Sequence, residues 1–210
     1  MFQAQRSPAR LELPGADLHY APGFLAAAEA DAWLWRLIDE IPWEQHRLRL
    51  FGREHAAPRL SCWIGDTDAV YVYSRTRFVP RPWTPTLLEL KARVEAACAA
   101  RFNSVLANRY RDGRDAMGWH SDDEPELGPD PVIASLSLGA PRRFLLRGRH
   151  APAQRLSLEL GHGSLLLMRG ATQANYRHAL PRTARPVGER INLTFRQIRP
   201  APPSSSQPAR

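Results

Sequence analysis

The chain has 210 residues, a formal net charge of +8 at pH 7 and two cysteines. This length suits one domain with a substantial core, and the distant positions of Cys62 and Cys98 exclude a disulfide framework or a Cys-x-x-Cys metal pair. No apolar run approaches the 18 residues of a transmembrane helix, and the first residues lack the apolar segment of a signal peptide. We therefore expect a cytoplasmic protein without membrane association, whose positive charge favours polyanionic partners.

Composition and periodicity predict where the domain lies. Residues 1–20 are expected to form a poorly ordered or loosely packed extension, residues 21–199 a single domain, and the Pro-, Ser- and Ala-rich residues 200–210 a disordered tail. Apolar residues with a helical period predict a helix over residues 24–41, and another over residues 85–101, which begins at a proline. Neither helix carries residues that indicate chemistry.

Residues 43–75, between the two helices, alternate short strand-like runs with turns, and we expect this segment to recognise nucleotides. A turn at Gly52 would expose Phe51 among arginines, as a protein needs if it must unstack bases while holding phosphates. A place for Phe51 in the core is an equally good interpretation. Tyr71 and Tyr73 share one strand face, where they either stack on a base or are ordinary half-buried residues.

The sequence His-x-Asp occurs at His120 and Asp122. On an extended segment, residues i and i+2 share a face about 6.6 Å apart, which is close enough for both to bind one ion. One imidazole and one carboxylate supply two of the three ligands of the facial triad found in non-haem Fe(II) oxygenases. The pair therefore predicts a metal site that a second histidine must complete.

Three downstream histidines compete for that place. His150 belongs to a basic stretch that we expect to be an exposed loop, and His162 lies in a Gly-His-Gly sequence that predicts a hairpin turn. His178 precedes residues 190–196, where strand alternation puts two arginines on one face. We therefore favour His178 as the third ligand.

The strand over residues 190–196 has Arg190, Asn192, Thr194 and Arg196 on one face and apolar residues on the other. The arginines either form a solvated face of an edge strand or bind an anion, and the dicarboxylate 2-oxoglutarate would give each a partner. The six residues between them span about 20 Å of strand. One arginine should therefore bind the distal carboxylate with Tyr110, and the other should support the end near the metal, an assignment that the sequence leaves open.

Strands are predicted over four further stretches, separated by turns that contain glycine. Those stretches are residues 132–138, 143–147, 155–160 and 164–168. Many short strands with helices packed on one side indicate an α+β protein with a jelly-roll core.

Together these residues resemble the AlkB-like family of Fe(II)- and 2-oxoglutarate-dependent dioxygenases that dealkylate nucleic acids. The resemblance is dense over residues 108–196 and traceable back to about residue 43. Its motifs are Asn108-x-Tyr110, Trp-His-Ser-Asp-Asp-Glu at 119–124, Ile-Ala-Ser-Leu-Ser-Leu-Gly at 133–139, His-Gly-Ser-Leu-Leu-Leu-Met at 162–168 and Arg-Ile-Asn-Leu-Thr-Phe-Arg at 190–196. The chain departs from the family at Glu189, where proline is expected, and at Tyr176, where tryptophan is common.

The resemblance implies a double-stranded β-helix core over residues 104–199, with iron on His120, Asp122 and His178. The residues implied to hold 2-oxoglutarate are Asn108, Tyr110, Arg190, Asn192 and Arg196. The implied reaction uses dioxygen to demethylate 1-methyladenine and 3-methylcytosine oxidatively, and it releases formaldehyde, succinate and CO₂. The expected protein is a monomer that acts on alkylated DNA, with RNA as a further substrate.

Glu124 lies two residues beyond Asp122, and its carboxylate would accept a hydrogen bond from the exocyclic amine of a flipped base. A solvated loop acid is the alternative, and the resemblance favours base recognition by Glu124 together with Phe51, Tyr71 and Tyr73. Two other functions remain open: a dioxygenase of this fold with a protein or small-molecule substrate, and a catalytically inactive nucleic-acid binder.

Overall fold

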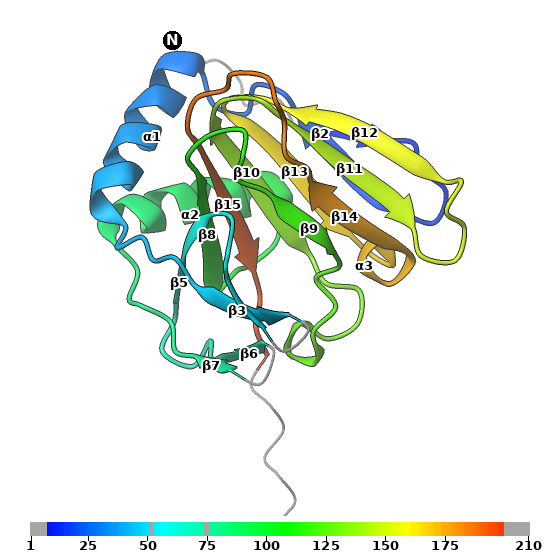
Figure 1. Ribbon diagram of the computed structural model, residues 1–210, viewed down its shortest axis with the longest axis horizontal. Coiled ribbons are helices and arrows are strands. Elements are labelled where there is room, and N and C mark those ends of the chain that lie inside the picture. Colours follow the sequence, from blue (N-terminus) through cyan, green and yellow to red (C-terminus); the bar gives the residue numbers. More distant parts are fainter. Residues whose placement is uncertain (1–7, 51–52, 74–75, 200–210) are drawn as a thin grey trace, which may run out of the picture.

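The computed structural model describes residues 8–50, 53–73 and 76–199. Two antiparallel sheets pack face to face, and the helices α1 and α2 cover the outer face of the larger sheet (Figure 1). The α+β jelly-roll prediction is therefore confirmed. No helix in the described ranges has the length and apolar character to cross a membrane.

The larger sheet has seven strands, and β15, the last of the named strands, lies inside it between β10 and β8. In spatial order its strands are β1 (Ala9–Leu11), β2 (Asp17–Ala21), β13 (Ser164–Arg169), β10 (Ile133–Gly139), β15 (Arg190–Arg196), β8 (Ser104–Tyr110) and β5 (Leu60–Gly65). The smaller sheet has the order β12 (Arg155–Leu160), β11 (Arg142–Gly148), β14 (Tyr176–Leu180) and β9 (Met117–His120).

Alternation along the strands supplies two apolar layers. In β13, Leu165 and Leu167 pack towards α1 and α2, whereas Leu166 and Met168 pack between the two sheets. The four side chains are all buried, which explains why residues 164–168 read as a continuous apolar run.

The two long helices follow the predicted periodicity but are shorter than expected. The first, α1, spans Ala27–Glu40, before Pro42, and α2 spans Pro85–Cys98. The Thr84 side chain accepts a hydrogen bond from the Leu87 N–H, and Pro85 takes a first-turn position, so α2 begins as its sequence predicts. Ala99 ends α2 in the left-handed conformation.

The remaining short elements lie outside the two large sheets. They are the hairpin of β3 (Arg47–Leu50) with β4 (Arg53–Ala56), the hairpin of β6 (Tyr71–Tyr73) with β7 (Thr76–Phe78), the 3₁₀ turn η1 (Pro125–Leu127) and the single turn α3 (Thr172–Asn175).

Two predictions about the chain path are wrong. Residues 8–20 are not loosely packed, because β1 and β2 extend the larger sheet through β13 and Leu18 is fully buried. The Gly161–Gly163 segment is not a hairpin turn, because β12 and β13 belong to different sheets. In a jelly roll the chain crosses between sheets at such points, and a local turn signal cannot distinguish that crossing from a hairpin.

Candidate active site

His120, Asp122 and His178 converge, with one potential ligand atom from each lying within 4.8 Å of the others. His178 lies on β14 directly opposite His120 on β9, and the two rings are 4.2 Å apart between centroids. Asp122 reaches the cluster by another route than the predicted strand alternation, because β9 ends at His120. The Asp122 N–H instead donates to Gln173 Oε1 at 3.0 Å, which fixes the loop that aims the carboxylate inwards.

The protonation states of the cluster suit metal ligation. Burial, with a smaller contribution from His120, lowers the pKa of His178 to about 3, so its imidazole is neutral at pH 7. Burial alone would raise the pKa of Asp122, but Arg196 and the two histidines outweigh it and hold that pKa below its ordinary value. A neutral imidazole and an ionised carboxylate are the forms that bind metals.

His120 is oriented by its own strand. Its Nδ1 lies 2.8 Å from the Gly118 carbonyl oxygen, which can only accept a hydrogen bond. Nδ1 therefore carries the proton, and Nε2 is left to bind a metal. His162, the competing histidine, is occupied elsewhere, since its Nδ1 accepts from the Gly139 N–H at 2.8 Å. The structure thus brings His178, and not His162, to the cluster.

The polar face of β15 forms one wall of the site, as its alternation predicts. Ile191, Leu193 and Phe195 pack under the helices, while the four alternate polar residues face a cavity between the sheets. All eight residues predicted for the metal and 2-oxoglutarate line this one cavity. They are Asn108, Tyr110, His120, Asp122, His178, Arg190, Asn192 and Arg196.

Arg196 supports the metal end of the cavity. Its Nη2 donates to Asp122 Oδ1 at 2.5 Å, and both side chains are almost wholly buried. The other carboxylate oxygen, Oδ2, lies 4.0 Å from His178 Nε2. Arg196 therefore neutralises Asp122 through one oxygen and leaves the other directed at the histidines.

Arg190 lies at the opposite end of the cavity and is 1% exposed. Its Nη2 donates to Ser137 Oγ at 3.1 Å, while Nε and Nη1 have no hydrogen-bond partner among the described residues. Its guanidinium lies 5.8 Å from the ring centroid of Tyr110, the residue opposite it in the sheet. Burial lowers the pKa of Arg190 to about 10, so it remains a cation at pH 7. A buried cation with unused donors fits an anionic ligand.

The amides between these ends are held by neighbouring side chains. Asn108 Oδ1 accepts from Arg59 Nε at 2.8 Å, and the Asn192 amide nitrogen donates to Ser135 Oγ at 2.7 Å. Sequence reasoning missed Arg59, Ser135, Ser137 and Gln173. The alternation of Ser135 and Ser137 on one face of β10 was a usable signal, whereas Arg59 and Gln173 come from distant segments with no pattern of their own.

The structure does not describe the side chains of three of the four predicted base-contacting residues. Phe51 lies outside the described residues, between the paired strands β3 and β4. Tyr71 and Tyr73 form β6, but their side chains also lie outside the description. Glu124 is half-buried just before η1 and does not line the cavity, because the strand geometry assumed for it ends at His120. Base recognition by these four residues remains a prediction.

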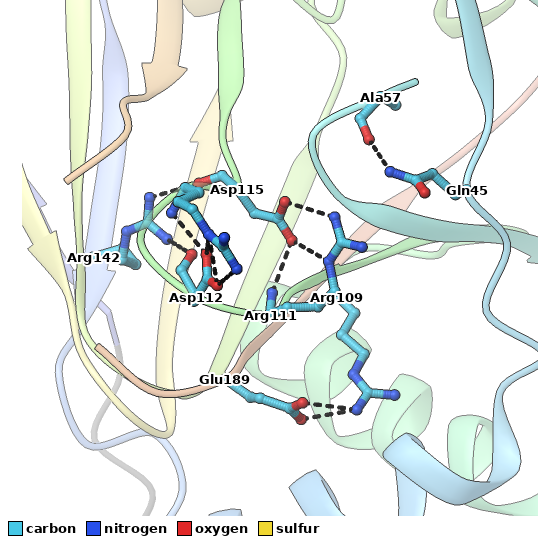
Figure 2. A network of polar contacts seen from close by, with 9 residues as sticks. Gln45, Ala57, Arg109, Arg111, Asp112, Asp115, Arg142 and Glu189 are labelled. Atoms are coloured by element: carbon cyan, nitrogen blue, oxygen red, sulfur yellow. Dashed lines mark hydrogen bonds and ion pairs between the residues drawn. The ribbon is translucent and has the colours of Figure 1, made fainter. Parts of the chain in front are cut away.

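Both departures from the family pattern are accommodated without touching the cavity. Glu189 forms an ion pair with Arg109, with a shortest distance of 2.8 Å between Arg109 Nη2 and Glu189 Oε1 (Figure 2). Tyr176 is buried, and its hydroxyl group contacts the Pro14 carbonyl oxygen and Gln154 Oε1.

Comparisons with known proteins agree with this geometry. The 2OG-Fe(II) oxygenase superfamily profile matches residues 17–196. Alpha-ketoglutarate-dependent dioxygenase alkB homolog 3 of Rattus norvegicus is 45% identical over 193 residues, which cover 86% of this chain and 64% of the relative. DNA oxidative demethylase ALKBH2 of Bos taurus is 39% identical over 202 residues, covering 91% of this chain and 72% of the relative.

The fold comparison points the same way. The structure titled "The structure of OsALKBH1" superposes with a TM-score of 0.64 at 17% identity, covering 90% of this chain and 99% of that one. Fe(II) and 2-oxoglutarate are the cofactor and cosubstrate of the superfamily. The cluster of two histidines and one aspartate fits Fe(II), and the buried Arg190 cation, with two nitrogens unpartnered among the described residues, fits a carboxylate of 2-oxoglutarate. The chain belongs to the AlkB-like family of the 2OG-Fe(II) oxygenase superfamily.

Proposed function

We propose that this chain is an Fe(II)- and 2-oxoglutarate-dependent dioxygenase that demethylates N-methylated bases of nucleic acid. The observation that carries the proposal is the single cavity with a three-ligand metal cluster at one end and an uncompensated buried arginine at the other. The names of the relatives, an alpha-ketoglutarate-dependent dioxygenase and a DNA oxidative demethylase, support the reaction class and alkylated DNA as substrate. RNA is a further candidate substrate.

The two arginines of β15 can now be given separate roles. Arg196 is committed to Asp122, so it supports the metal end. Arg190 has two nitrogens, Nε and Nη1, without a hydrogen-bond partner in the described part of the chain, and it lies beside Tyr110, so it suits the distal carboxylate of 2-oxoglutarate. His120, Asp122 and His178 would hold Fe(II), and Asn108 and Asn192 would flank the cosubstrate between the two ends.

When bound, iron and 2-oxoglutarate supply with dioxygen the oxidising power that hydroxylates an N-methyl carbon, and the hydroxylated methyl group then leaves as formaldehyde. The chain positions the reactants and limits the access of water. Leu106, Leu160 and Met168 line the cavity beside the ligands and give it apolar walls. Arg196 and Gln173 keep the Asp122 carboxylate ionised and correctly turned.

The proposed substrates, 1-methyladenine and 3-methylcytosine, carry their methyl groups on the base-pairing edge. Such lesions weaken pairing and reduce the cost of extruding the nucleotide from a duplex. The net charge of +8 favours binding to the phosphate backbone. We propose that Phe51 takes the place of the extruded base, while Tyr71, Tyr73 and Glu124 contact the base itself.

A methylated oligonucleotide, incubated with the full chain, Fe(II) and 2-oxoglutarate, tests the proposal. Formaldehyde and succinate should form in equal amounts, and omission of either cofactor or of the methyl group should stop formaldehyde release. Turnover only with a protein or small molecule would move the function to another substrate class. Tight oligonucleotide binding without turnover would make the chain a nucleic-acid binder. Testing one lesion in single- and double-stranded DNA and RNA would define the preferred context.

A further inference from the structure

Arg142 is a buried cation close to the site that no step of the proposed reaction uses. It begins β11, is 3% exposed and does not line the cavity. Its guanidinium lies 5.9 Å from the Tyr110 ring centroid, and Arg190 lies 5.8 Å from the same ring. Tyr110 is therefore flanked by two buried arginines, one that faces the cavity and one that does not.

Among the described residues, Arg142 donates its hydrogen bonds to main-chain carbonyl groups and not to carboxylates. Nη1 donates to the Asp112 carbonyl at 3.1 Å, and Nη2 donates to the Asp115 and Pro181 carbonyls, each at 2.8 Å. Figure 2 shows its two bonds to the loop that contains Asp112 and Asp115. Because a guanidinium presents several donors in a rigid plane, it can fix three carbonyls in one arrangement, as a flexible or apolar side chain cannot.

These carbonyls belong to the two connections that cross between the sheets at this end. Residues 111–116 run from Tyr110 on β8 towards His120 on β9, and Pro181 begins the connection from β14 to β15. The connections also touch directly, since the Thr183 N–H donates to the Gly113 carbonyl at 2.9 Å. A Cβ at Gly113 would lie 2.4 Å from the Thr183 carbonyl oxygen, so the approach leaves no room for a side chain.

Ion pairs stiffen the loop over residues 111–116 from within. Asp115 is buried and accepts a hydrogen bond from Arg111 Nε at 2.8 Å (Figure 2). Asp112 forms an ion pair with Arg114 at 2.6 Å. The side-chain carboxylates of Asp112 and Asp115 thus form ion pairs within the loop, whereas the main-chain carbonyl groups of the same two residues accept hydrogen bonds from Arg142. Arg142 therefore joins this internally bonded loop to the chain that leads into β15.

We infer that Arg142 is a positioning residue for the cosubstrate: by locking the β8–β9 connection against Pro181, it sets Tyr110 at the distal end of the cavity and fixes the length of dicarboxylate that fits. The inference rests on the proposed function, because it assumes that the distal carboxylate binds between Tyr110 and Arg190. It assigns to Arg142 no contact with iron, dioxygen or the nucleic acid.

The test compares Arg142→Met and Arg142→Gln with Arg143→Met, a matched control because Arg143 is the exposed neighbour on the other face of β11. Calorimetric titration of the Mn(II)-loaded full chain should show a Kd for 2-oxoglutarate raised about tenfold in both Arg142 variants and unchanged in the control. The Kd for Mn(II) should stay within about twofold of wild type. Discrimination between 2-oxoglutarate and 2-oxoadipate, which is one methylene longer, should fall.

Steady-state kinetics should show a raised KM for 2-oxoglutarate with kcat at saturation preserved. Equal loss of Mn(II) and 2-oxoglutarate binding, or unchanged 2-oxoglutarate binding, would overturn the inference. In wild type, hydrogen exchange should slow at residues 113–115 when 2-oxoglutarate binds, and no slowing would also overturn it, whatever the variants do. If the Mn(II)-loaded wild type does not bind 2-oxoglutarate, the proposed function fails instead.

Discussion

The two ends of β15 carry the same side chain in opposite electrostatic situations. Arg196 is buried against Asp122, so its charge is balanced within the protein. Arg190 is equally buried, yet its neighbours are a serine hydroxyl group, a tyrosine ring and another arginine. The charge of Arg196 is thus balanced by a neighbouring side chain, whereas within the described residues the Arg190 guanidinium has no carboxylate partner, which suits the anionic ligand proposed for it. The two arginines should therefore respond differently to mutation.

The metal cluster beside Arg196 should give the largest effect. His178→Ala removes one of the three proposed ligands, so the proposed demethylation should fall below detection while the circular dichroism spectrum is retained. His162→Ala is the matched control, since His162 bonds to Gly139 away from the cluster. Formaldehyde release measures both variants. A wild-type rate in His178→Ala would refute the triad.

Arg196→Met should destabilise the metal-free protein by about 3 kcal/mol, because it leaves the Asp122 carboxylate buried without its cation. Urea unfolding monitored by fluorescence measures the change. Adding Asp122→Asn should restore part of the loss by removing the unpaired charge. If the single variant is as stable as wild type, the ion pair is not an integral part of the fold.

Arg190→Met should have the opposite profile. Stability should be unchanged or increased, since the substitution removes an uncompensated buried charge. The Kd of the Mn(II)-loaded protein for 2-oxoglutarate should rise about a hundredfold with the loss of the charged donors. Calorimetry gives the Kd, and urea unfolding gives the stability. A large stability loss with normal 2-oxoglutarate binding would erase the contrast with Arg196.

The metal end should also dominate the pH dependence of the metal-free protein. His178 has an ordinary pKa of 6.5 that burial lowers to about 3 in the folded state. Between these values the unfolded chain binds a proton that the folded protein does not, so stability should fall as the pH decreases from about 6.5 towards 3. Urea unfolding across this range tests it, and His178→Leu should flatten the slope. An equal slope in that variant would assign the effect to other groups.

The smallest effect is expected outside the cavity. Phe51→Ala should reduce turnover several-fold on duplex substrate and less on single strands, because only a duplex requires the gap left by an extruded base to be filled. Parallel assays on the same lesion in both contexts measure the ratio. Equal loss in both contexts would identify Phe51 as a core residue.

Local pattern predicted the part of the site that lies on one strand. The polar and apolar faces of β15 follow from alternation, because both faces are buried in different surroundings. The same rule placed Asp122 beside His120 for the wrong reason, because its loop is held by Gln173, which lies 51 residues away in the sequence. Such a contact depends on tertiary packing, which no local period encodes.

Long-range topology accounts for the other errors. The Gly-His-Gly segment at residues 161–163 has every local feature of a hairpin, yet it crosses between sheets. Arg142 lay outside the strand predicted over residues 143–147 and was given no role, because its burial depends on carbonyls from two distant connections. His178 was preferred to His162 because it precedes the strand with two arginines, and the structure brings it to His120 by pairing β14 with β9, which its sequence position did not indicate.

The position of β15 inside the larger sheet has a consequence for folding during synthesis. Every other named strand precedes it in the chain, and until it inserts, the facing edges of β8 and β10 have no partner. A nascent chain released before residue 190 would therefore lack Arg190 and Arg196, and it would expose the unpaired edges of β8 and β10, which are prone to aggregate. Premature termination should thus yield aggregated chains that are degraded, and not a partly active dioxygenase.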